Sequence, residues 1–333
     1  MGRIEWLTLA RKRWTLEELT AGVRAGEQRA LARAITLVEN GDPLGYPLVR
    51  DLYAETGKAA VIGVTGPPGV GKSSLIAALI AHVRATGPTV GVVSVDPSSP
   101  FSRGALLGDR IRLSDHFLDP GVYIRSMGNR GHQGGVAEAT LQAVLLLDAS
   151  GKDVVFVETV GAGQSEVEVT GIADSILLVL MPGSGDSVQA LKAGIMEIPD
   201  VIAINKMEHA EAKTMLNEVR SVIRLAGTAE RQPPIVLTEA LVGTNVPELW
   251  KELEEQRVAL ARDGGLDDRR RRNLAAEVFA VASSRARSHL ETAVRDDAEL
   301  ERVLEAVQER TLDPLSAVRE ILDKVFRIDA DER

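Results

Sequence analysis

Short apolar runs separated by helical segments fill the middle of the chain. From residue 59 onward, about six runs of β-branched and other apolar residues alternate with stretches of helix-favouring composition. Runs without polar interruption are typical of strands buried on both faces, as in a mostly parallel sheet covered by helices. The pattern therefore predicts an α/β fold whose strands end near Thr238. The runs are AAVIGVTG, TVGVVSVD, DVVFVET, SILLVLMP, DVIAINK and PPIVLT.

Helical patterns flank these runs on both sides. Ahead of them, apolar residues from Leu31 to Val38 recur with the spacing of one helix face, which predicts an amphipathic helix. After Trp250 the chain is charged and helical and has little core of its own, so its last helices are expected to pack on the main domain or on a second subunit. Their apolar faces comprise Leu300, Val303, Leu304 and Val307, and Val318, Ile321, Leu322 and Val325.

Two polar signals mark this C-terminal part. Asp313 followed by Pro314 predicts an N-cap and the first position of a helix. Residues Arg269 to Arg272 are four consecutive arginines. Such a run could contact nucleic acid, but it is more typical of a solvated linker.

Composition narrows the possible functions. The chain of 333 residues carries 39 basic and 48 acidic side chains and a formal charge of -9, which argues against nonspecific nucleic-acid binding. It has no cysteine, and its five histidines form no close pair with the spacing of zinc ligands. The apolar runs are too short to cross a bilayer, and the first residues lack a secretory pattern. A cytoplasmic protein without a membrane or nucleic-acid partner is expected.

The most specific motif lies between the first apolar run and a helical segment. Its sequence, GPPGVGKS, satisfies G-x-x-x-x-G-K-[ST] in the strand-to-helix context that this motif requires. Backbone N–H groups of such a loop turn toward one anion, Lys72 is expected to reach the β- and γ-phosphates, and Ser73 is expected to bind Mg²⁺. The predicted phosphate-binding residues are Gly66, Pro67, Pro68, Gly69, Val70, Gly71, Lys72, Ser73 and Ser74.

Carboxylates follow two further runs. Asp96 ends the second run and Glu158 the third. Because ligands of open α/β sheets bind beyond the carboxyl ends of the strands, either residue could hold Mg²⁺. Alternatively, each could serve as a turn or cap acceptor. Glu158 and Gly161 also have the spacing of a D-x-x-G switch with Glu in place of Asp, which predicts that the Gly161 N–H contacts the γ-phosphate.

The sequence INKMEH follows the fifth run and has the spacing of an Asn-Lys-x-Asp base-recognition loop, with Glu208 at the last position. A carboxylate there can accept from both guanine N–H groups, whereas the edge of adenine would leave the charge badly matched. The extra methylene of Glu208 moves the acceptor by roughly 1 to 1.5 Å. The alternative is that Glu208 is merely the first exposed residue of a helix.

Seven segments follow one another along the chain: GPPGVGKSSL, VDPSSP, RGALLGDRIR, RGHQGG, ETVGAGQSE, GSGDSVQALKAGIMEIPD and INK. In this order they resemble the methylmalonyl-CoA mutase-associated GTPases, the MeaB/ArgK-like metallochaperones of the SIMIBI class of P-loop proteins. The resemblance implies a P-loop NTPase with a mostly parallel sheet flanked by helices. It also implies a helical N-terminal extension over 1–58, a GTPase domain over 59–262 and a helical dimerisation arm over 263–333.

This resemblance implies a GTP-hydrolysing chaperone of an adenosylcobalamin-dependent acyl-CoA mutase, which gates cofactor loading and protects or reactivates the mutase. Hydrolysis is expected to be slow for the chain alone and stimulated by the mutase. That mutase could be of the methylmalonyl-, isobutyryl- or 2-hydroxyisobutyryl-CoA type. GTP or GDP and Mg²⁺ are the implied cofactors, and a homodimer is the implied assembly.

The resemblance also assigns roles by position. Asp186 could equally cap a helix that begins near Ser187, and His132 is a weak candidate for a general base because phosphoryl transfer relies mainly on positioning and charge. The implied catalytic residues are Lys72, Asp96, Asp109, Glu158 and Gly161; the metal ligands Ser73, Asp96, Asp109 and Glu158; the base-site residues Asn205, Lys206, Glu208, Thr238, Glu239 and Ala240; and the switch residues Arg130, His132, Gln164, Asp186 and Lys192.

Three other functions are compatible with the phosphate-binding motif GPPGVGKS. A kinase would transfer phosphate to an acceptor other than water, but no acceptor site is recognisable in the sequence. A nickel-insertion accessory protein would need soft or imidazole ligands, which a chain without cysteine or clustered histidine supplies poorly. A non-enzymatic binding module would retain its nucleotide without turnover.

Overall fold

The computed structural model describes residues 14–96, 113–128, 135–159, 171–183, 199–226 and 232–326. Contacts divide the chain into two units, Met1–Glu277 and Val278–Arg333. The first unit contains the sheet and the helices that cover it, and the second consists of helices among its described residues. The domain boundaries expected after residues 58 and 262 stay predictions.

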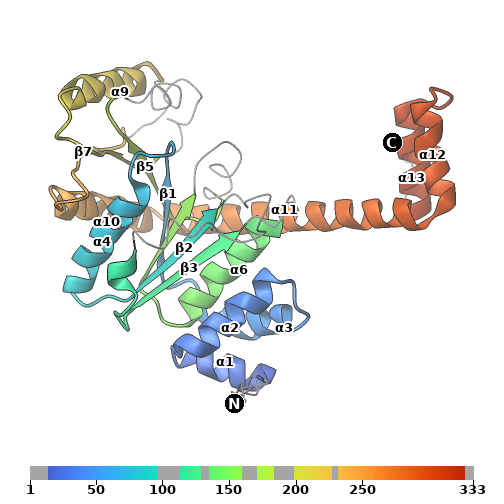
Figure 1. Ribbon diagram of the computed structural model, residues 1–333, viewed down its shortest axis with the longest axis horizontal. Helices are drawn as coiled ribbons and strands as arrows, with labels where there is room; N and C mark the ends of the chain where they lie inside the picture. The colour runs from blue at the N-terminus through green and yellow to red at the C-terminus, as the bar shows by residue number, and fades with distance from the viewer. Residues whose placement is uncertain are drawn as a thin grey trace, which may run out of the picture. The chain divides into compact units, whose positions relative to one another are not determined.

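A seven-stranded parallel sheet forms the centre of the first unit (Figure 1). Its strand order is β3-β2-β4-β1-β5-β6-β7, and every pairing between named strands is parallel, which confirms the predicted α/β class. Because all strands run the same way, their carboxyl ends meet at one edge of the sheet. The strands are β1 (Ala60–Thr65), β2 (Val90–Asp96), β3 (Val122–Gly128), β4 (Val154–Thr159), β5 (Ser175–Leu180), β6 (Val201–Ile204) and β7 (Ile235–Leu237).

The prediction of six strands was one short, because it missed the edge strand β3. The sequence of β3, VYIRSMG, interrupts the apolar pattern with Arg125 and Ser126. Arg125 forms a hydrogen-bonded ion pair with Glu39 of α2, so its charge is compensated by a helix far away in the sequence. An edge strand has only one neighbour in the sheet, and β3 therefore does not need an uninterrupted apolar sequence.

The N-terminal helices and α6 cover one face of the sheet. Helix α2 buries Leu31, Ala34, Ile35 and Val38, which confirms the predicted amphipathic face. These side chains join those of α6 and of alternate strand positions such as Val155 in one core. The helices are α1 (Leu16–Arg24), α2 (Gln28–Glu39), α3 (Gly45–Leu52) and α6 (Gly135–Ala149).

Helices α4 (Lys72–Ala85) and α10 (Val246–Arg262) cover the opposite face. Strand positions such as Phe156 and Leu177 pack there against Leu79 of α4 and Leu249 of α10. Helix α9 (Ala212–Ala226) packs on β5 and β6 on the same face as α6. This sandwich leaves the carboxyl edge of the sheet to be closed by loops, and the predicted phosphate motif lies in one of them.

The four consecutive arginines lie in the first turns of α11 (Gly265–Asp296), and the predicted solvated linker is wrong. Arg269 donates to both carboxylate oxygens of Asp200 at 2.6 and 2.9 Å. Arg270 donates to both oxygens of Asp174 at 2.6 Å and to the carbonyls of Gly57 and Ala59. Two of the arginines therefore attach α11 to the amino ends of β1, β5 and β6.

The second unit holds the last part of α11 together with α12 (Ala298–Gln308) and α13 (Pro314–Phe326). Helix α13 begins at Pro314, and the Asp313 carboxylate accepts from the N–H groups of Leu315 and Ser316, which confirms the predicted cap. Lys324 pairs with Asp297 and Glu299 and so links the two helices. Among the described residues, no helix is long and apolar enough to cross a membrane.

Candidate nucleotide-binding site

The loop between β1 and α4 has the backbone that the phosphate motif requires. Gly66, Gly69 and Gly71 have positive φ angles of 139°, 79° and 94°. A Cβ on Gly66 would lie 2.1 Å from the Val179 carbonyl oxygen, so only glycine fits where the loop passes β5. Helix α4 begins directly after this loop, at Lys72, and its first N–H groups therefore face an anion that the loop would hold.

The side chain of Lys72 is buried and packs against this loop. Its ammonium donates to the carbonyl oxygens of Gly66 at 2.6 Å and Pro67 at 3.1 Å. The side chain thus curls back along the inside of the loop that it follows in the sequence. A cation placed there, beside the N–H groups at the start of α4, suits the binding of a phosphate.

Glu158 lies beside the phosphate loop, at the carboxyl end of β4, and is almost fully buried. Its Oε1 accepts from the Ser73 hydroxyl at 2.7 Å, and its Oε2 lies 3.4 Å from the Ser94 hydroxyl on β2. The predicted proximity of Ser73 and Glu158 is thus present. Sequence reasoning missed Ser94, although a serine inside the apolar run TVGVVSVD was a usable signal.

Asn205 joins three loops at the same edge of the sheet. Its Nδ2 donates to the Val70 carbonyl oxygen of the phosphate loop at 2.9 Å. Its Oδ1 accepts from the Thr238 hydroxyl at 3.3 Å and from the Ala240 backbone N–H at 3.1 Å. Gly71 is required for this approach, since a Cβ there would lie 2.5 Å from Asn205 Nδ2. The predicted phosphate and base segments are therefore one hydrogen-bonded unit.

The residues after Asn205 turn sharply toward solvent. Lys206 has a positive φ of 59°, an unusual conformation for a non-glycine residue, and its ammonium donates to the Gly69 carbonyl oxygen at 3.2 Å. The Met207 N–H donates to the Thr238 carbonyl at 3.0 Å, which fixes the turn against the segment after β7. Glu208 follows and is exposed, in the turn that precedes α9. Its carboxylate is thus accessible to a ligand bound at this edge.

Comparison with known proteins agrees with this geometry. A family model described as "Methylmalonyl Co-A mutase-associated GTPase MeaB" matches residues 31–295. The chain belongs to the MeaB family of GTPases. A protein of Pyrococcus abyssi named as a GTPase is 43% identical over 315 residues, which are 93% of this chain and 97% of the relative. GTPase ArgK of Escherichia coli is 33% identical over 317 residues, 92% of this chain and 96% of the relative.

A solved structure agrees as well. The crystal structure of an LAO/AO transport system kinase has a TM-score of 0.70 and 28% sequence identity, and the match covers 94% of this chain and 98% of that chain. Its likeness extends beyond the sheet to the helical parts, since nearly the whole of both chains is covered. The predicted recognition, the P-loop fold with its helical extensions and the GTPase activity are thereby confirmed.

Several residues that the MeaB resemblance singles out lie outside the described part of the chain. For Asp96, the structure gives the backbone at the end of β2 and nothing of the side chain. Among the described residues, no group of three acidic or histidine side chains could hold a metal ion on its own. The residues outside the described part are Asp109, Arg130, His132, Gly161, Gln164, Asp186 and Lys192.

The described residues nevertheless suit an Mg²⁺ ion that a bound nucleotide would help to coordinate. Mg²⁺ prefers hard oxygen ligands and uses few from the protein, because phosphates and water complete its shell. The Ser73 hydroxyl and the Glu158 carboxylate provide such oxygens and already contact each other. Two oxygens beside a phosphate loop therefore suit a nucleotide-bound Mg²⁺ rather than a structural metal.

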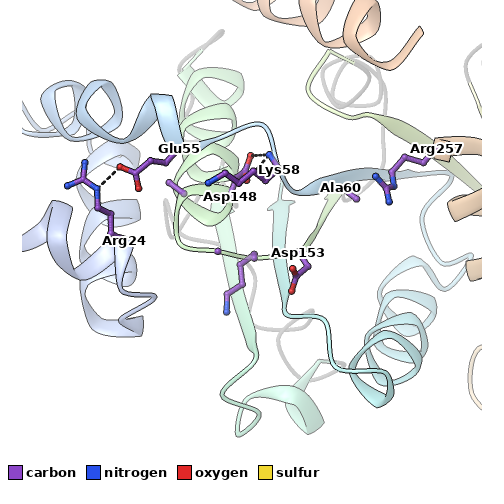
Figure 2. A pocket seen from close by; sticks show the side chains of 10 residues that line it. Arg24, Glu55, Lys58, Ala60, Asp148, Asp153 and Arg257 are labelled. Atoms are coloured by element: carbon purple, nitrogen blue, oxygen red, sulfur yellow. Dashed lines mark hydrogen bonds and ion pairs between the residues drawn. The ribbon is translucent and has the colours of Figure 1, made fainter. Parts of the chain in front are cut away.

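A cavity of about 490 Å³ lies near the amino ends of β1 and β4, away from the phosphate loop (Figure 2). Its carboxylates already have partners: Glu55 pairs with Arg24, Asp148 accepts from the N–H groups of Gly57, Lys58 and Ala59, and Asp153 accepts from Thr89. These contacts tie α1 and the segment before β1 to the end of α6. Ligands of parallel α/β sheets bind at the other edge, so this cavity is not a candidate for the nucleotide site.

Proposed function

We propose that this GTPase is a chaperone of an adenosylcobalamin-dependent acyl-CoA mutase, and that GTP hydrolysis gates cofactor loading and protection or reactivation of the mutase. The mutase is of the methylmalonyl-, isobutyryl- or 2-hydroxyisobutyryl-CoA type. The description of the matching family, which names association with methylmalonyl-CoA mutase, supports this partner. The structural observation that supports the proposal is Asn205, whose three hydrogen bonds join the phosphate loop to the loops of the expected base site, as one bound nucleotide would require.

In this proposal each described residue of the site has a separate task. The phosphate loop, the start of α4 and Lys72 hold the β- and γ-phosphates, and Glu208 accepts from the guanine edge. Ser73 and Glu158 would hold Mg²⁺, which supplies positive charge beside the transferred phosphate. These groups position and stabilise charge but provide no evident general base, which supports slow hydrolysis in the absence of a partner.

The catalytic and switch residues outside the described part keep their predicted roles in this proposal. Asp109 joins Asp96 and Glu158 in the acidic set, and Gly161 contacts the γ-phosphate. Glu239 belongs to the base site with Thr238 and Ala240. The switch residues are Arg130, His132, Gln164, Asp186 and Lys192, and the loop that contains Asp186 and Lys192 reports nucleotide state to the mutase.

The test is Mg²⁺-dependent hydrolysis of GTP and ATP by the full chain, with and without a candidate cobalamin-dependent mutase. A strong preference for GTP and a faster turnover beside the mutase are expected. Equal use of the two nucleotides would contradict guanine recognition by Glu208. A GTP preference without any response to mutases of the three types would contradict the chaperone role alone.

A kinase is the second candidate, because the similar solved structure is that of a protein described as a transport system kinase. A kinase moves the γ-phosphate to an acceptor other than water. GTP labelled in the γ-phosphate distinguishes the two: the GTPase proposal expects all label in inorganic phosphate, with the mutase present as well. Label that stays on a protein or on a small molecule would support the kinase instead.

A further inference from the structure

Ser94 is a buried polar residue inside an otherwise apolar strand. It lies in β2 between Val93 and Val95, and it is only 1% exposed. A buried hydroxyl costs stability unless it makes a hydrogen bond, and a valine suits a buried strand better. The Ser94 hydroxyl therefore needs a partner, and the pairing of the strands shows where that partner lies.

The register of the sheet sets Ser94 beside Glu158. Ser94 of β2 lies directly opposite Glu158 of β4. Two residues earlier in these strands, Val92 and Phe156 belong to the core that α4 covers. Because side chains alternate along a strand, Ser94 and Glu158 point to this same face of the sheet. The contact between them is thus fixed by two paired backbones rather than by a loop.

The two oxygens of Glu158 face different hydroxyl groups. Oε1 accepts from Ser73 at 2.7 Å, and Oε2 accepts from Ser94 at 3.4 Å. A hydroxyl has one proton and two lone pairs, so Ser73 can donate to Glu158 and still offer a lone pair to Mg²⁺. In the proposed site Ser73 is therefore a metal ligand that contacts this carboxylate, whereas Ser94 contacts its other oxygen from within the sheet.

We propose that Ser94 is a positioning residue, whose hydroxyl holds the Glu158 carboxylate in the orientation that Mg²⁺ requires. This inference rests on the proposed nucleotide site. Mg²⁺ demands near-ideal octahedral geometry, so a carboxylate that is free to rotate binds it less well. Groups that hydrogen-bond to a metal ligand orient the ligand and tune the affinity for the metal. Ser94 acts in this way through Glu158 rather than by contacting the nucleotide.

The test compares Ser94→Ala with Ser175→Ala. Ser175 is a matched control, because it is also 1% exposed, lies at the amino end of β5, and has a hydroxyl without a hydrogen-bond partner among the described residues. Both variants keep the full chain, and thermal denaturation without metal checks their folding. A fluorescent, non-hydrolysable GTP analogue reports nucleotide affinity in EDTA and over a series of Mg²⁺ concentrations, and GTP hydrolysis is measured over the same series.

Ser94→Ala is expected to raise the Mg²⁺ concentration that half-saturates analogue binding and GTP hydrolysis by about threefold to tenfold. The increase is moderate because 3.4 Å is long for an O–H···O hydrogen bond. Affinity in EDTA stays unchanged, since it does not involve a metal ligand, and Ser175→Ala changes none of these quantities. In a Glu158→Ala background, adding Ser94→Ala changes the Mg²⁺ dependence no further, because its effect passes through that carboxylate.

An unchanged Mg²⁺ requirement in Ser94→Ala would overturn the inference. Equal weakening of analogue binding in EDTA would also overturn it, because Ser94 would then support the fold of the site rather than a metal ligand. The same holds if Ser175→Ala raises the Mg²⁺ requirement as much as Ser94→Ala does. If the unmodified chain binds no guanine nucleotide with or without Mg²⁺, the proposed function itself fails, and this inference fails with it.

Discussion

At the residue scale, Asn205 shows how one amide side chain defines the site. It is almost fully buried, and both ends of its amide are used: the nitrogen by the phosphate loop and the oxygen by the segment after β7. An aspartate would lose the donor and a leucine both partners, which leaves buried polar groups unsatisfied. Asparagine at this place is thus explained by the protein's own contacts before any nucleotide binds.

Sequence reasoning found the residues of this site better than the bonds between them. Gly66, Gly71, Lys72 and Ser73 follow from a motif whose spacing is short and whose chemistry is local. Glu158 could be placed as well, because strand ends converge at one edge. The serine inside TVGVVSVD signalled a polar side chain in that strand, but its contact with Glu158 and the joining role of Asn205 depend on the strand order, which the sequence does not state.

Replacing Lys152 tests how much the burial of one charged side chain destabilises the fold. It is buried at the amino end of β4, where its ammonium makes a long hydrogen bond of 3.4 Å to the Gly121 carbonyl, and burial lowers the pKa of Lys152. Lys152→Met is therefore expected to stabilise the chain at pH 7 by about 1 kcal/mol, because folding no longer desolvates a charge. Thermal or urea unfolding of both proteins measures this.

The effect of Lys152 on the stability of the fold changes with pH in a defined direction. The folded-state pKa of Lys152 is lower than its unfolded value, so the unfolded chain binds more protons between the two and stability rises with pH there. The advantage of Lys152→Met should be full below the folded-state pKa of Lys152 and shrink as the pH rises from there toward the unfolded value of about 10.5. A methionine variant less stable than the unmodified chain at pH 7 would show that the Gly121 contact outweighs desolvation.

At the scale of elements, the attachment of α11 to the sheet is the least expected feature. The six apolar runs predicted their strands because burial on both faces leaves a continuous pattern. The partners of Arg269 and Arg270 lie 69 and 96 residues away in the sequence, at Asp200 and Asp174. A run of arginines is read as solvated when such distant carboxylates are not known to face it.

Replacing Arg270 should therefore destabilise the first unit. The Asp174 side chain is only 3% exposed and also accepts from the Val61 N–H at 3.0 Å, so Arg270→Ala leaves a buried carboxylate without its cation. The full cost of breaking a buried pair is about 3 to 5 kcal/mol, and since Arg270 is partly exposed we expect about 2 kcal/mol. Chemical denaturation with urea measures the difference.

The neighbouring arginine supplies the control. Arg271 pairs with Asp268 on the same helix, and both side chains are largely exposed, so Arg271→Ala should cost less than about 0.5 kcal/mol. Adding Asp174→Asn to Arg270→Ala should recover part of the loss, because the amide oxygen still accepts from Val61 and the unpaired charge is gone. Equal stability of the Arg270 and Arg271 variants would contradict a structural role for this pair.

At the scale of the whole molecule, the two units differ in how completely they bury their apolar side chains. The first has continuous cores on both faces of its sheet. In the second, the fully buried apolar residues among those described are Leu300 and Ala317, while Leu304 and Val318 remain 42% and 50% exposed. Apolar faces that a small helical unit cannot bury by itself favour association with a second copy, which supports the homodimer that the resemblance implies.

The groove between α11, α12 and α13 is the place where a substitution is expected to separate the two copies of such a dimer. It has a volume of about 490 Å³, and Glu291 and Arg295 line it together with the apolar residues Leu290, Val294, Leu304, Val318, Ile321 and Leu322. Val318→Asp places a charge among these apolar side chains, where an interface would remove it from water. We expect the variant to be monomeric by light scattering coupled to gel filtration, and to retain its basal GTP hydrolysis because the phosphate loop belongs to the first unit.

Leu315→Asp is the matched control for this change. Leu315 lies on the same helix and is 76% exposed, but it does not line the groove, so this variant should remain dimeric. If both variants dissociate, the interface covers more of α13 than the groove. If the unmodified chain is dimeric and Val318→Asp stays so, the groove is not the interface, and the exposed apolar residues on α11, such as Phe279, become the place to test.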